Sequence, residues 1–397
     1  MKFTLIATDL QKSGEFFISQ INKTKETSRF IMLTSLPSIY FLAKRSGIKC
    51  FLVSRKITFS LELKDSDLEY VREYRSKVVK KRSVLSLIRR WYSKIEEINQ
   101  DFPIKDIYVW NGQDVVGASI YKFKERNPEV ETFFCEISNL PGKLYVDKEG
   151  TGIKSSFFTK NPLGHLEEVS DEAFRAWVEH YKEDKFHKNK NKIQQAENQK
   201  TFEFRHIYNT LYVLYLGYLF SFSYLLRKLK FKLLKGDIQQ VLAGEQAIPG
   251  EFVLAPLQVS SDTNLIINSN ANNYDLIDHC LLNYQLPVVV KLHPAEDDFS
   301  SLKKLINRFN QNERVFFSNK NIFDLLIRAE HIVTINSTVG LEAKIFGKDL
   351  SVLGFAPFCR LTNYSDLKKY IMGFLLDIDY FKSDNNVSLF NTIEASN

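Results

Sequence analysis

The sequence lacks the short motifs that most often identify nucleotide-dependent or hydrolytic enzymes. No GxGxxG follows an apolar run, and neither GxxxxGK[ST] nor GxSxG occurs in the 397 residues. These absences leave dinucleotide-binding, P-loop and serine-hydrolase interpretations without support.

Cysteine is scarce and scattered. The chain has four, Cys50, Cys135, Cys280 and Cys359, with no CxxC pair and no Cys/His metal spacing. This pattern is typical of reduced core cysteines in a cytosolic protein. The first 17 residues contain too short an apolar run for a signal peptide, so we expect a cytoplasmic chain.

A strong charge of one sign is also lacking. Lys and Arg number 54 and Asp and Glu 47, which gives a formal net charge of +7. This mild excess does not require nucleic acid as a partner and fits phosphates or an anionic membrane surface equally well. DxD pairs occur at Asp65/Asp67 and Asp377/Asp379, but both lie in predicted helical surface, so we expect no metal and no cofactor.

The most informative stretch is Val288–Gly354. The run VVVKLHP ends in Lys291 and His293, and a second apolar run ends in Asn336, Ser337 and Thr338 before a predicted helix. Continuous apolar runs indicate strands of a parallel sheet, whose carboxyl ends meet at one edge. Basic side chains and the amino end of a helix together suit a phosphate group.

The pattern along the chain predicts an α/β fold, GT-B-like, with two Rossmann-like domains and a helical insertion between them. The predicted boundaries are 1–165 for an acceptor-side domain, 166–245 for the insertion, 246–360 for a nucleotide-binding domain, and 361–397 for a C-terminal helix and tail. Within them we predict strands at 30–34, 48–53, 104–111, 131–135, 251–256, 288–292, 315–317, 332–335 and 350–354. We predict helices at 36–46, 66–100, 274–285, 301–310, 322–328, 339–346 and 366–381, with a frayed last dozen residues.

Two segments leave alternatives open. Nine Lys or Arg residues lie between Arg72 and Lys94, which form either a solvated helix face or a basic surface for acidic acceptor or lipid head groups. Residues 207–226 contain twenty residues without a charge, but five are Tyr. They form a buried or interdomain helix, a helix lying in the membrane interface, or a membrane span. Residues 182–200 are polar and predict either a linker or a solvated helix end.

Three carboxylates stand where site residues are expected. Glu136 follows the predicted strand at 131–135, and Asp262 follows the strand at 251–256. Glu342 falls one helical turn after Thr338, a spacing that suits ribose hydroxyls. Each has a plain alternative, because loops and helix ends also use carboxylates as caps.

Four motifs then match a known family in order. They are WNG at 110–112, ExxxLPGxLxxDxxG at 136–150, PLQVxxD at 256–262, and KLHP with NSTxGLEA at 291–294 and 336–343. Together they resemble the bacterial capsule-polysaccharide retaining β-Kdo glycosyltransferases. The resemblance covers roughly residues 105–155 and 250–355.

The resemblance implies the donor CMP-β-Kdo and transfer by double displacement. It implies Asp262 as the nucleophile, Glu136 as an acid/base residue, and His293 with Lys291 at the phosphate and the developing charge. It also implies nucleotide binding by a further set of residues, namely Gln258, Asn336, Ser337, Thr338 and Glu342. A saccharide or lipid-linked acceptor and peripheral contact with the inner membrane are the expected partners, with no nucleic acid.

Two other functions fit the same residues. One is another cytidine-nucleotide transferase, such as a CDP-alditol polymerase of the teichoic-acid type, which would also use a His-Pro pair and a Ser/Thr turn near phosphates. The other is a non-catalytic, membrane-bound capsule assembly protein, suggested by residues 207–226 and the basic segment 72–94.

Overall fold

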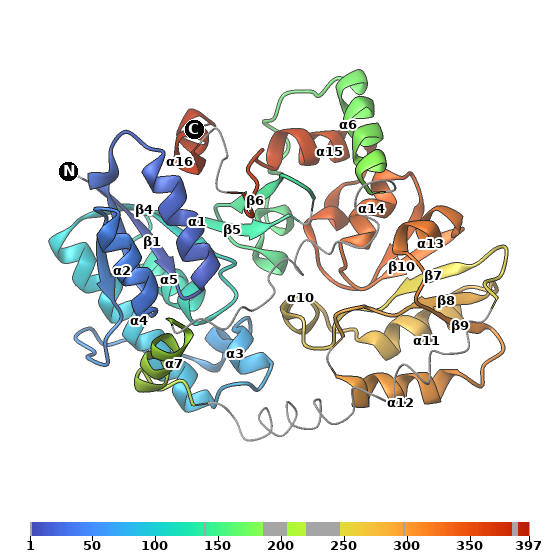
Figure 1. Cartoon of the computed structure of the whole chain (residues 1–397), viewed down its shortest axis with the longest axis horizontal. Coiled ribbons are helices and arrows are strands. Elements are labelled where there is room, and N and C mark those ends of the chain that lie inside the picture. Colours follow the sequence, from blue (N-terminus) through green and yellow to red (C-terminus); the bar gives the residue numbers. More distant parts are fainter. Residues whose placement is uncertain are drawn as a thin grey trace. The chain divides into compact units, whose positions relative to one another are not determined.

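The computed structural model describes residues 2–138, 140–185, 205–219, 247–296, 298–382 and 388–396. They form two compact α/β units (Figure 1). The first unit combines residues 1–161, 198–221 and 374–397, and the second combines residues 162–197 and 222–373. The described helices within the predicted insertion at 166–245 are divided between these two units. Helix α6 (Asp171–Glu183) belongs to the second unit and helix α7 (Arg205–Tyr215) to the first.

The first unit contains a six-stranded sheet in the order β3-β2-β1-β4-β5-β6. All neighbouring strands are parallel except β6, which runs antiparallel to β5. The strands are β1 (Phe3–Thr8), β2 (Phe30–Thr34), β3 (Lys49–Leu52), β4 (Ile104–Trp110), β5 (Glu131–Ile137) and β6 (Leu144–Asp147). The helices include α1 (Gln11–Asn22), α2 (Pro37–Arg45), α3 (Arg72–Arg75), α4 (Lys81–Asp101), α5 (Val115–Arg126) and α16 (Leu389–Ser396).

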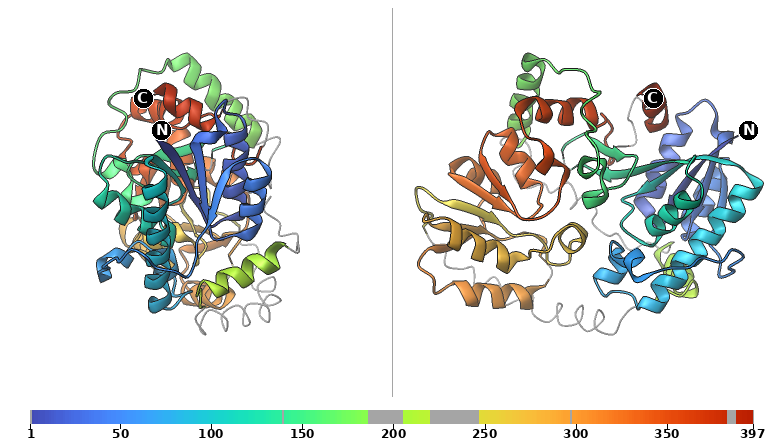
Figure 2. Two further views of the ribbon diagram at one scale, coloured as in Figure 1. Left: turned by 90° about the vertical axis from the view of Figure 1, so that its left-hand side faces the viewer. Right: turned by 180° about the vertical axis from the view of Figure 1, so that it is seen from behind.

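Alternating side chains of this sheet supply two separate cores. Leu5 and Ala7 point to the face covered by α4 and α5, and Ile6 points to the face covered by α1, α2 and α16. Trp91 of α4 and Phe17 of α1 are fully buried. Each such side chain stabilises the fold by about 1.5–3 kcal/mol, which makes these helices the main cover of the sheet (Figure 2).

Three predictions for this unit were wrong or incomplete. Strand β1 and helix α1 were not predicted, although β1 lies in the middle of the sheet. The charged segment at 66–100 is not one helix, because the chain turns between α3 and α4 and Lys77 has a positive φ of 54°. Residues 388–396, the described part of the tail, are not frayed, since Leu389 and Phe390 of α16 are buried in one cluster with Phe30.

The second unit has a five-stranded parallel sheet in the order β11-β10-β7-β8-β9. Helices α11 and α12 cover one face, and α13 and α14 cover the other. The strands are β7 (Val253–Pro256), β8 (Val288–Lys291), β9 (Val315–Ser318), β10 (His331–Thr334) and β11 (Asp349–Val352). The helices include α10 (Thr263–Ile267), α11 (Asn273–Asn283), α12 (Phe299–Phe309), α13 (Ile322–Arg328), α14 (Val339–Ile345) and α15 (Tyr364–Lys369).

This topology confirms the predicted class of two Rossmann-like units with parallel sheets. The predicted helix at 366–381 is too long, because α15 passes into a π-helical turn that ends at Phe374. The predicted linker at 182–200 falls mostly outside the described residues, as do residues 220–226 of the uncharged segment.

Candidate functional site

Polar residues gather at the carboxyl ends of β7, β8 and β10 in the second unit. Gln258 follows β7, Lys291 ends β8 with His293 two residues beyond, and Asn336 follows β10. Because β7 lies between β10 and β8 in the parallel sheet, these ends share one edge. This is the edge where the sequence predicted a phosphate site.

Gln258 and Asn336 form a buried reciprocal pair. The Asn336 backbone N–H donates to Gln258 Oε1 over 3.0 Å, and Gln258 Nε2 donates to Asn336 Oδ1 over 2.8 Å. Asn336 Nδ2 also donates to the carbonyl oxygens of Asn264 and Asn268. A backbone N–H can only donate, so its bond fixes the orientation of both amides. Both side chains thus support the loops after β7 and β10 from within.

Asp262 is held at the start of helix α10. Its Oδ1 accepts from the Asn264 N–H over 2.9 Å, as an N-cap does. Burial raises the pKa of its carboxyl, while that hydrogen bond and the nearby His293 act to lower the pKa. Capping occupies one oxygen, and Asp262 and His293 are close enough to interact electrostatically.

His293 has a defined tautomer when it is neutral. Its Nδ1 accepts from the Ala295 N–H over 3.1 Å, so Nε2 carries the proton. Burial lowers the pKa of the imidazole, although Asp262 and Glu296 act to raise it. At neutral pH His293 therefore offers a hydrogen-bond donor at Nε2.

Lys291 supplies the cation of this edge. Its Nζ donates to the Leu292 carbonyl over 2.8 Å, and burial lowers its pKa to about 8. The ammonium is therefore still mostly charged at pH 7. An anion bound beside it would offset the cost of burial and restore the charge at higher pH.

Glu296 is a positioning residue that the sequence did not reveal. Its Oε2 accepts from both the backbone N–H and the hydroxyl of Ser260, each over 2.9 Å, and its Oε1 accepts from the Asp298 N–H. These bonds join the loop after β8 to the loop that carries Asp262. The only sequence signal was the position of Glu296 three residues after His293 in the KLHP stretch.

Ser337, Thr338 and Glu342 lie on helix α14 or at its start. Ser337 Oγ accepts from the Val339 N–H over 3.3 Å, and Thr338 makes no side-chain capping bond to the described helix. Gly340 packs so tightly that an added Cβ would lie 2.6 Å from the ring of Phe358. The phosphate-binding roles of Ser337 and Thr338 stay predictions.

Glu342 is buried beneath helix α6. The Tyr181 hydroxyl donates to its Oε1 over 2.7 Å, and Lys185 Nζ lies 3.6 Å from the same oxygen. Burial raises the pKa of this carboxyl. Its predicted contact with a ribose stays a prediction, and the contact with Tyr181 was not foreseen because 161 residues separate the partners.

In the first unit, Glu136 pairs with Asn111 across neighbouring strands. Glu136 lies inside β5, not just past a strand as predicted, and its Oε1 accepts from Asn111 Nδ2 over 2.9 Å. Asn111 and Gly112 have φ values of 64° and 81°, and this turn places the amide beside the carboxylate. The Thr151 hydroxyl donates to the Asn111 carbonyl over 2.6 Å. The WNG motif and the Glu136–Gly150 motif therefore form one local structure.

Asp147 organises the folding of that second motif. Its two oxygens accept hydrogen bonds from Tyr145, Glu149, Gly150, Ser155 and Ser156. A buried carboxylate with this many donors fixes the chain around it. Asp147 is therefore a structural hub of the loop after β6.

A buried charge cluster was missed because strand β1 was missed. Asp9 follows β1, Asp114 caps α5, and both interact electrostatically with Arg72 and Glu73. Burial raises the pKa of Asp9 to about 6 and raises that of Asp114 well above its usual range. Three carboxyl groups share one guanidinium, so protons are held in this cluster.

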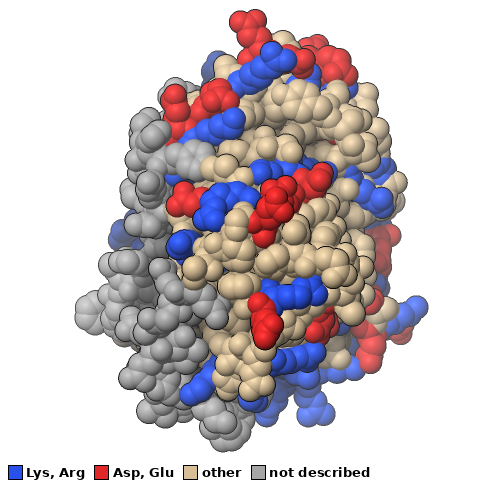
Figure 3. All heavy atoms as spheres, turned by 90° about the vertical axis from the view of Figure 1, so that its right-hand side faces the viewer, with Lys and Arg blue, Asp and Glu red and all other residues tan. Residues whose placement is uncertain are grey.

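The charged side chains and the helices of the described residues bear on metal, ionic and membrane partners. Carboxylates of both DxD pairs form ion pairs, Asp65 with Lys81 at 2.7 Å and Asp377 with Lys143 at 2.7 Å. Over the described part of the face shown in Figure 3, acidic and basic side chains are interspersed. Among the described helices, none has both the length and the apolar character needed to cross a membrane.

Two curated proteins match short stretches of the chain. Protein FixF of Sinorhizobium fredii is 36% identical over 113 residues, which is 27% of each chain. The capsule polysaccharide export protein KpsS of Escherichia coli is 30% identical over 119 residues, 27% of this chain and 31% of that protein. The chain thus matches less than a third of the length of either relative.

Two solved structures are similar at low identity. The KpsC β-Kdo 2,7 transferase of Thermosulfurimonas dismutans is 12% identical with a TM-score of 0.40, covering 91% of this chain and 82% of that one. HepE of Anabaena, solved with UDP, is 12% identical with a TM-score of 0.29, covering 92% and 84%. Similarity at this level does not specify a function.

A family model provides the broader match. The model described as capsule polysaccharide biosynthesis protein matches residues 133–362, more than half of the chain, and this range includes Glu136, Asp262, His293 and the Asn336–Ala343 motif. The chain therefore belongs to the family of capsule polysaccharide biosynthesis proteins.

Proposed function

We propose that this protein is a retaining glycosyltransferase that moves Kdo from CMP-β-Kdo to a saccharide or lipid-linked acceptor. The observation that carries the proposal is that Asp262 and His293 follow the neighbouring parallel strands β7 and β8 at the carboxyl edge of the second sheet, close enough to interact electrostatically. A carboxylate and a neutral imidazole with Nε2–H are the groups that a nucleophilic displacement of a nucleotide requires. Family membership and the ordered motifs support the same function.

In the first step, the Asp262 carboxylate attacks the anomeric carbon of Kdo. The bond from that carbon to the phosphate oxygen breaks, and CMP leaves with the electron pair. Nε2–H of His293 donates to the leaving oxygen, and Lys291 neutralises the phosphate charge. The product is a Kdo ester of Asp262 with inverted configuration.

In the second step, an acceptor hydroxyl attacks the same carbon and displaces the Asp262 carboxylate. The second inversion restores the original configuration. The hydroxyl proton needs a base, and the family resemblance assigns this role to Glu136, whose carboxylate is oriented by Asn111. Ser337 and Thr338 are proposed to bind the CMP phosphate, and Glu342 the ribose. The scheme uses no metal ion.

The nucleophile is tested with Asp262→Asn. We expect loss of Kdo transfer with CMP affinity retained, because the substitution removes the charge and keeps the cap acceptor for Asn264. Asp324→Asn, an exposed carboxyl in the first turn of α13, is the matched control and should stay active. Mass spectrometry of the wild-type protein with CMP-Kdo and no acceptor should show one Kdo on the peptide containing Asp262. Full activity of Asp262→Asn would remove the nucleophile from the scheme.

The donor is tested by comparing CMP-Kdo with CDP-glycerol and following release of CMP. Release from CMP-Kdo alone supports the proposal, and release from CDP-glycerol alone indicates a CDP-alditol transferase. A thermal-shift measurement with CMP tests the non-catalytic alternative, which predicts no binding of the nucleotide. No stabilisation by CMP and no turnover of either donor would overturn the proposal.

A further inference from the structure

Helix α7 is attached to the first unit by one face. Asn209 is buried, with Oδ1 accepting from the Ser38 N–H over 3.1 Å and Nδ2 donating to the Ser38 hydroxyl over 2.7 Å. The Tyr212 hydroxyl donates to the Val53 carbonyl over 2.9 Å. Leu216, just past the helix, is fully buried. These contacts fix which side of α7 faces away from the unit.

The outward side of α7 is a continuous apolar stripe. Leu211 is 61% exposed and Tyr215 is 52% exposed, and the other exposed large side chains on this helix are Ile207, Tyr208 and Leu214. Positions 207, 208, 211, 214 and 215 follow the spacing of one helix face. Phe41 of α2, 60% exposed, extends the stripe onto the neighbouring helix. Contiguous exposed apolar surface of this kind marks a binding face rather than ordinary surface.

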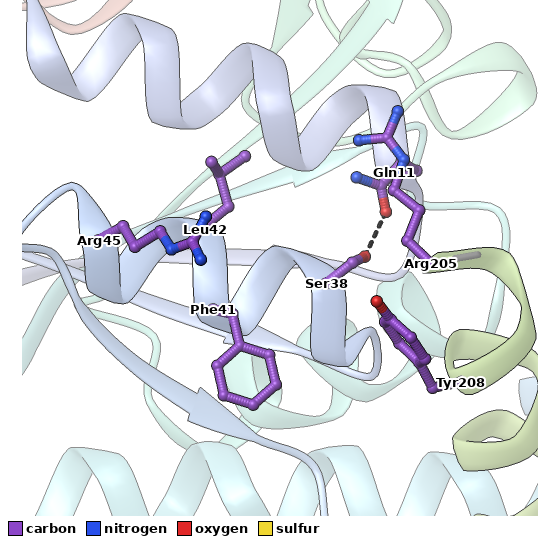
Figure 4. Close-up of a pocket in the computed structure, with 7 residues that line it drawn as sticks. All are labelled: Gln11, Ser38, Phe41, Leu42, Arg45, Arg205 and Tyr208. Carbon is purple, nitrogen blue, oxygen red and sulfur yellow. Dashed lines mark hydrogen bonds between the residues drawn. The ribbon is translucent and has the colours of Figure 1, made fainter. Parts of the chain in front are cut away.

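A pocket of about 300 Å³ opens at one end of this stripe. Figure 4 shows Arg45 and Leu42 of α2 and Arg205 and Tyr208 of α7 around it. Arg45 is exposed, and Arg205 lies 2.8 Å from Glu15. The pocket therefore combines apolar walls with two guanidinium groups.

Two more arginines lie at the other end. The guanidinium of Arg55 sits over the Tyr215 ring, 5.2 Å from its centroid, and Arg55 and Arg90 repel each other electrostatically. Nε and Nη1 of Arg90 are buried without a hydrogen-bond partner among the described residues. Ile57, on the same loop as Arg55, is also exposed. This end of the stripe therefore carries guanidinium charge beside exposed apolar side chains.

We propose that this face, formed by α2, α7 and the loop at Arg55, binds the surface of an anionic phospholipid bilayer. The apolar stripe enters the interface between head groups and acyl chains, and the exposed Arg45 and Arg55, one at each end, contact phosphates. Tyr208 and Tyr215 suit this depth, since tyrosine prefers the interface. The inference does not depend on the transferase proposal, because none of these residues takes part in that scheme.

The test is cosedimentation of the full-length protein with vesicles. Vesicles of phosphatidylcholine alone are compared with vesicles in which part of it is replaced by phosphatidylserine. We expect binding to the anionic vesicles that weakens with added salt. Leu211→Ser should weaken this binding about tenfold, because it removes one large side chain from the interface. Arg45→Gln and Arg55→Gln should each weaken it about fivefold on anionic vesicles.

Leu282→Ser is the matched control. Leu282, on α11 of the second unit, is 81% exposed, so its removal changes the same chemistry elsewhere. Each variant is checked for unchanged thermal unfolding without vesicles. The inference is overturned if the wild-type protein does not sediment with anionic vesicles, or if Leu211→Ser and Leu282→Ser bind alike. It is also overturned if ultracentrifugation without lipid shows a dimer that Leu211→Ser dissociates, which would make the face a contact between copies.

Discussion

Exchanging Gln258 for Glu changes one group in the centre of the second unit. Nε2 of Gln258 donates to Asn336 Oδ1 over 2.8 Å, so the substitution sets two oxygen atoms against each other. The other oxygen can still accept from the Asn336 N–H. Both residues are buried, so water does not replace the lost donor.

The size of the stability loss follows from the least costly way to restore a hydrogen-bond donor at position 258. If the introduced carboxyl is protonated, it can donate to Asn336 Oδ1. Protonation at pH 7 of a group with an ordinary pKa of about 4.3 costs about 3.7 kcal/mol, at 1.36 kcal/mol per pH unit. We therefore expect Gln258→Glu to lower the free energy of unfolding by about 3–4 kcal/mol at pH 7. At about 2–4 °C per kcal/mol, Tm should fall by roughly 7–15 °C.

The direction in which this stability deficit changes with pH is the stricter test of the reasoning. The folded variant keeps the proton while the unfolded chain releases it, so the deficit shrinks as pH falls and is about 1 kcal/mol near pH 5. Thermal unfolding of the wild type and the variant between pH 5 and pH 8 measures this. Gln285→Glu, the same exchange at an exposed position, should show no such deficit. Equal Tm values for Gln258→Glu and the wild type at pH 7, or a deficit that does not shrink in acid, would refute the reasoning.

Three other substitutions probe the turns and the buried charges. Gly117→Ala would place a Cβ 1.9 Å from the Gly112 carbonyl oxygen, so the turn after β4 must shift and Tm should fall, with a loss of about 1–3 kcal/mol; an unchanged Tm would contradict this. Glu296→Gln exchanges one acceptor oxygen for a donor, so the hydrogen bond from Ser260 at one oxygen or from Asp298 at the other is lost. We expect the free energy of unfolding in chemical denaturation to fall by about 1–3 kcal/mol, and wild-type stability would argue against the role of this side chain. In the wild type, burial raises the pKa of Asp9 from 3.8 to about 6, so the folded chain binds this proton more tightly than the unfolded chain does. The free energy of unfolding therefore falls by up to about 3 kcal/mol as the pH rises from about 4 through 6. Asp9→Asn removes this loss, so the variant should gain on the wild type from pH 4 to pH 7 in denaturant titrations, whereas parallel stability curves would speak against it.

The five strands of the second unit and helices α11 to α14 lie within two residues of their predicted bounds, whereas helices α6 and α10 were not predicted. Runs such as Val288–Val290 are buried on both faces of the sheet, and a strand buried on both faces requires apolar residues at every position. Helix α13 has the predicted bounds of 322–328, and the structure adds an N-cap from Asn321. In the first unit, β1 escaped notice because its six residues are followed at once by polar sequence, and α16 because its buried surface is only a few side chains.

The sequence by itself determined the family, the fold class and the strand ends at which polar residues collect, because these depend on short-range patterns of burial and turn chemistry. Only the tertiary structure decided what those residues touch. It joined Glu136 to Asn111, 25 residues apart, Gln258 to Asn336, 78 apart, and Tyr181 to Glu342, 161 apart. It also lowered the pKa of His293 and of Lys291, and it left one apolar face of helix α7 exposed. Such pairings and pKa shifts arise from packing between distant segments, which no local pattern records.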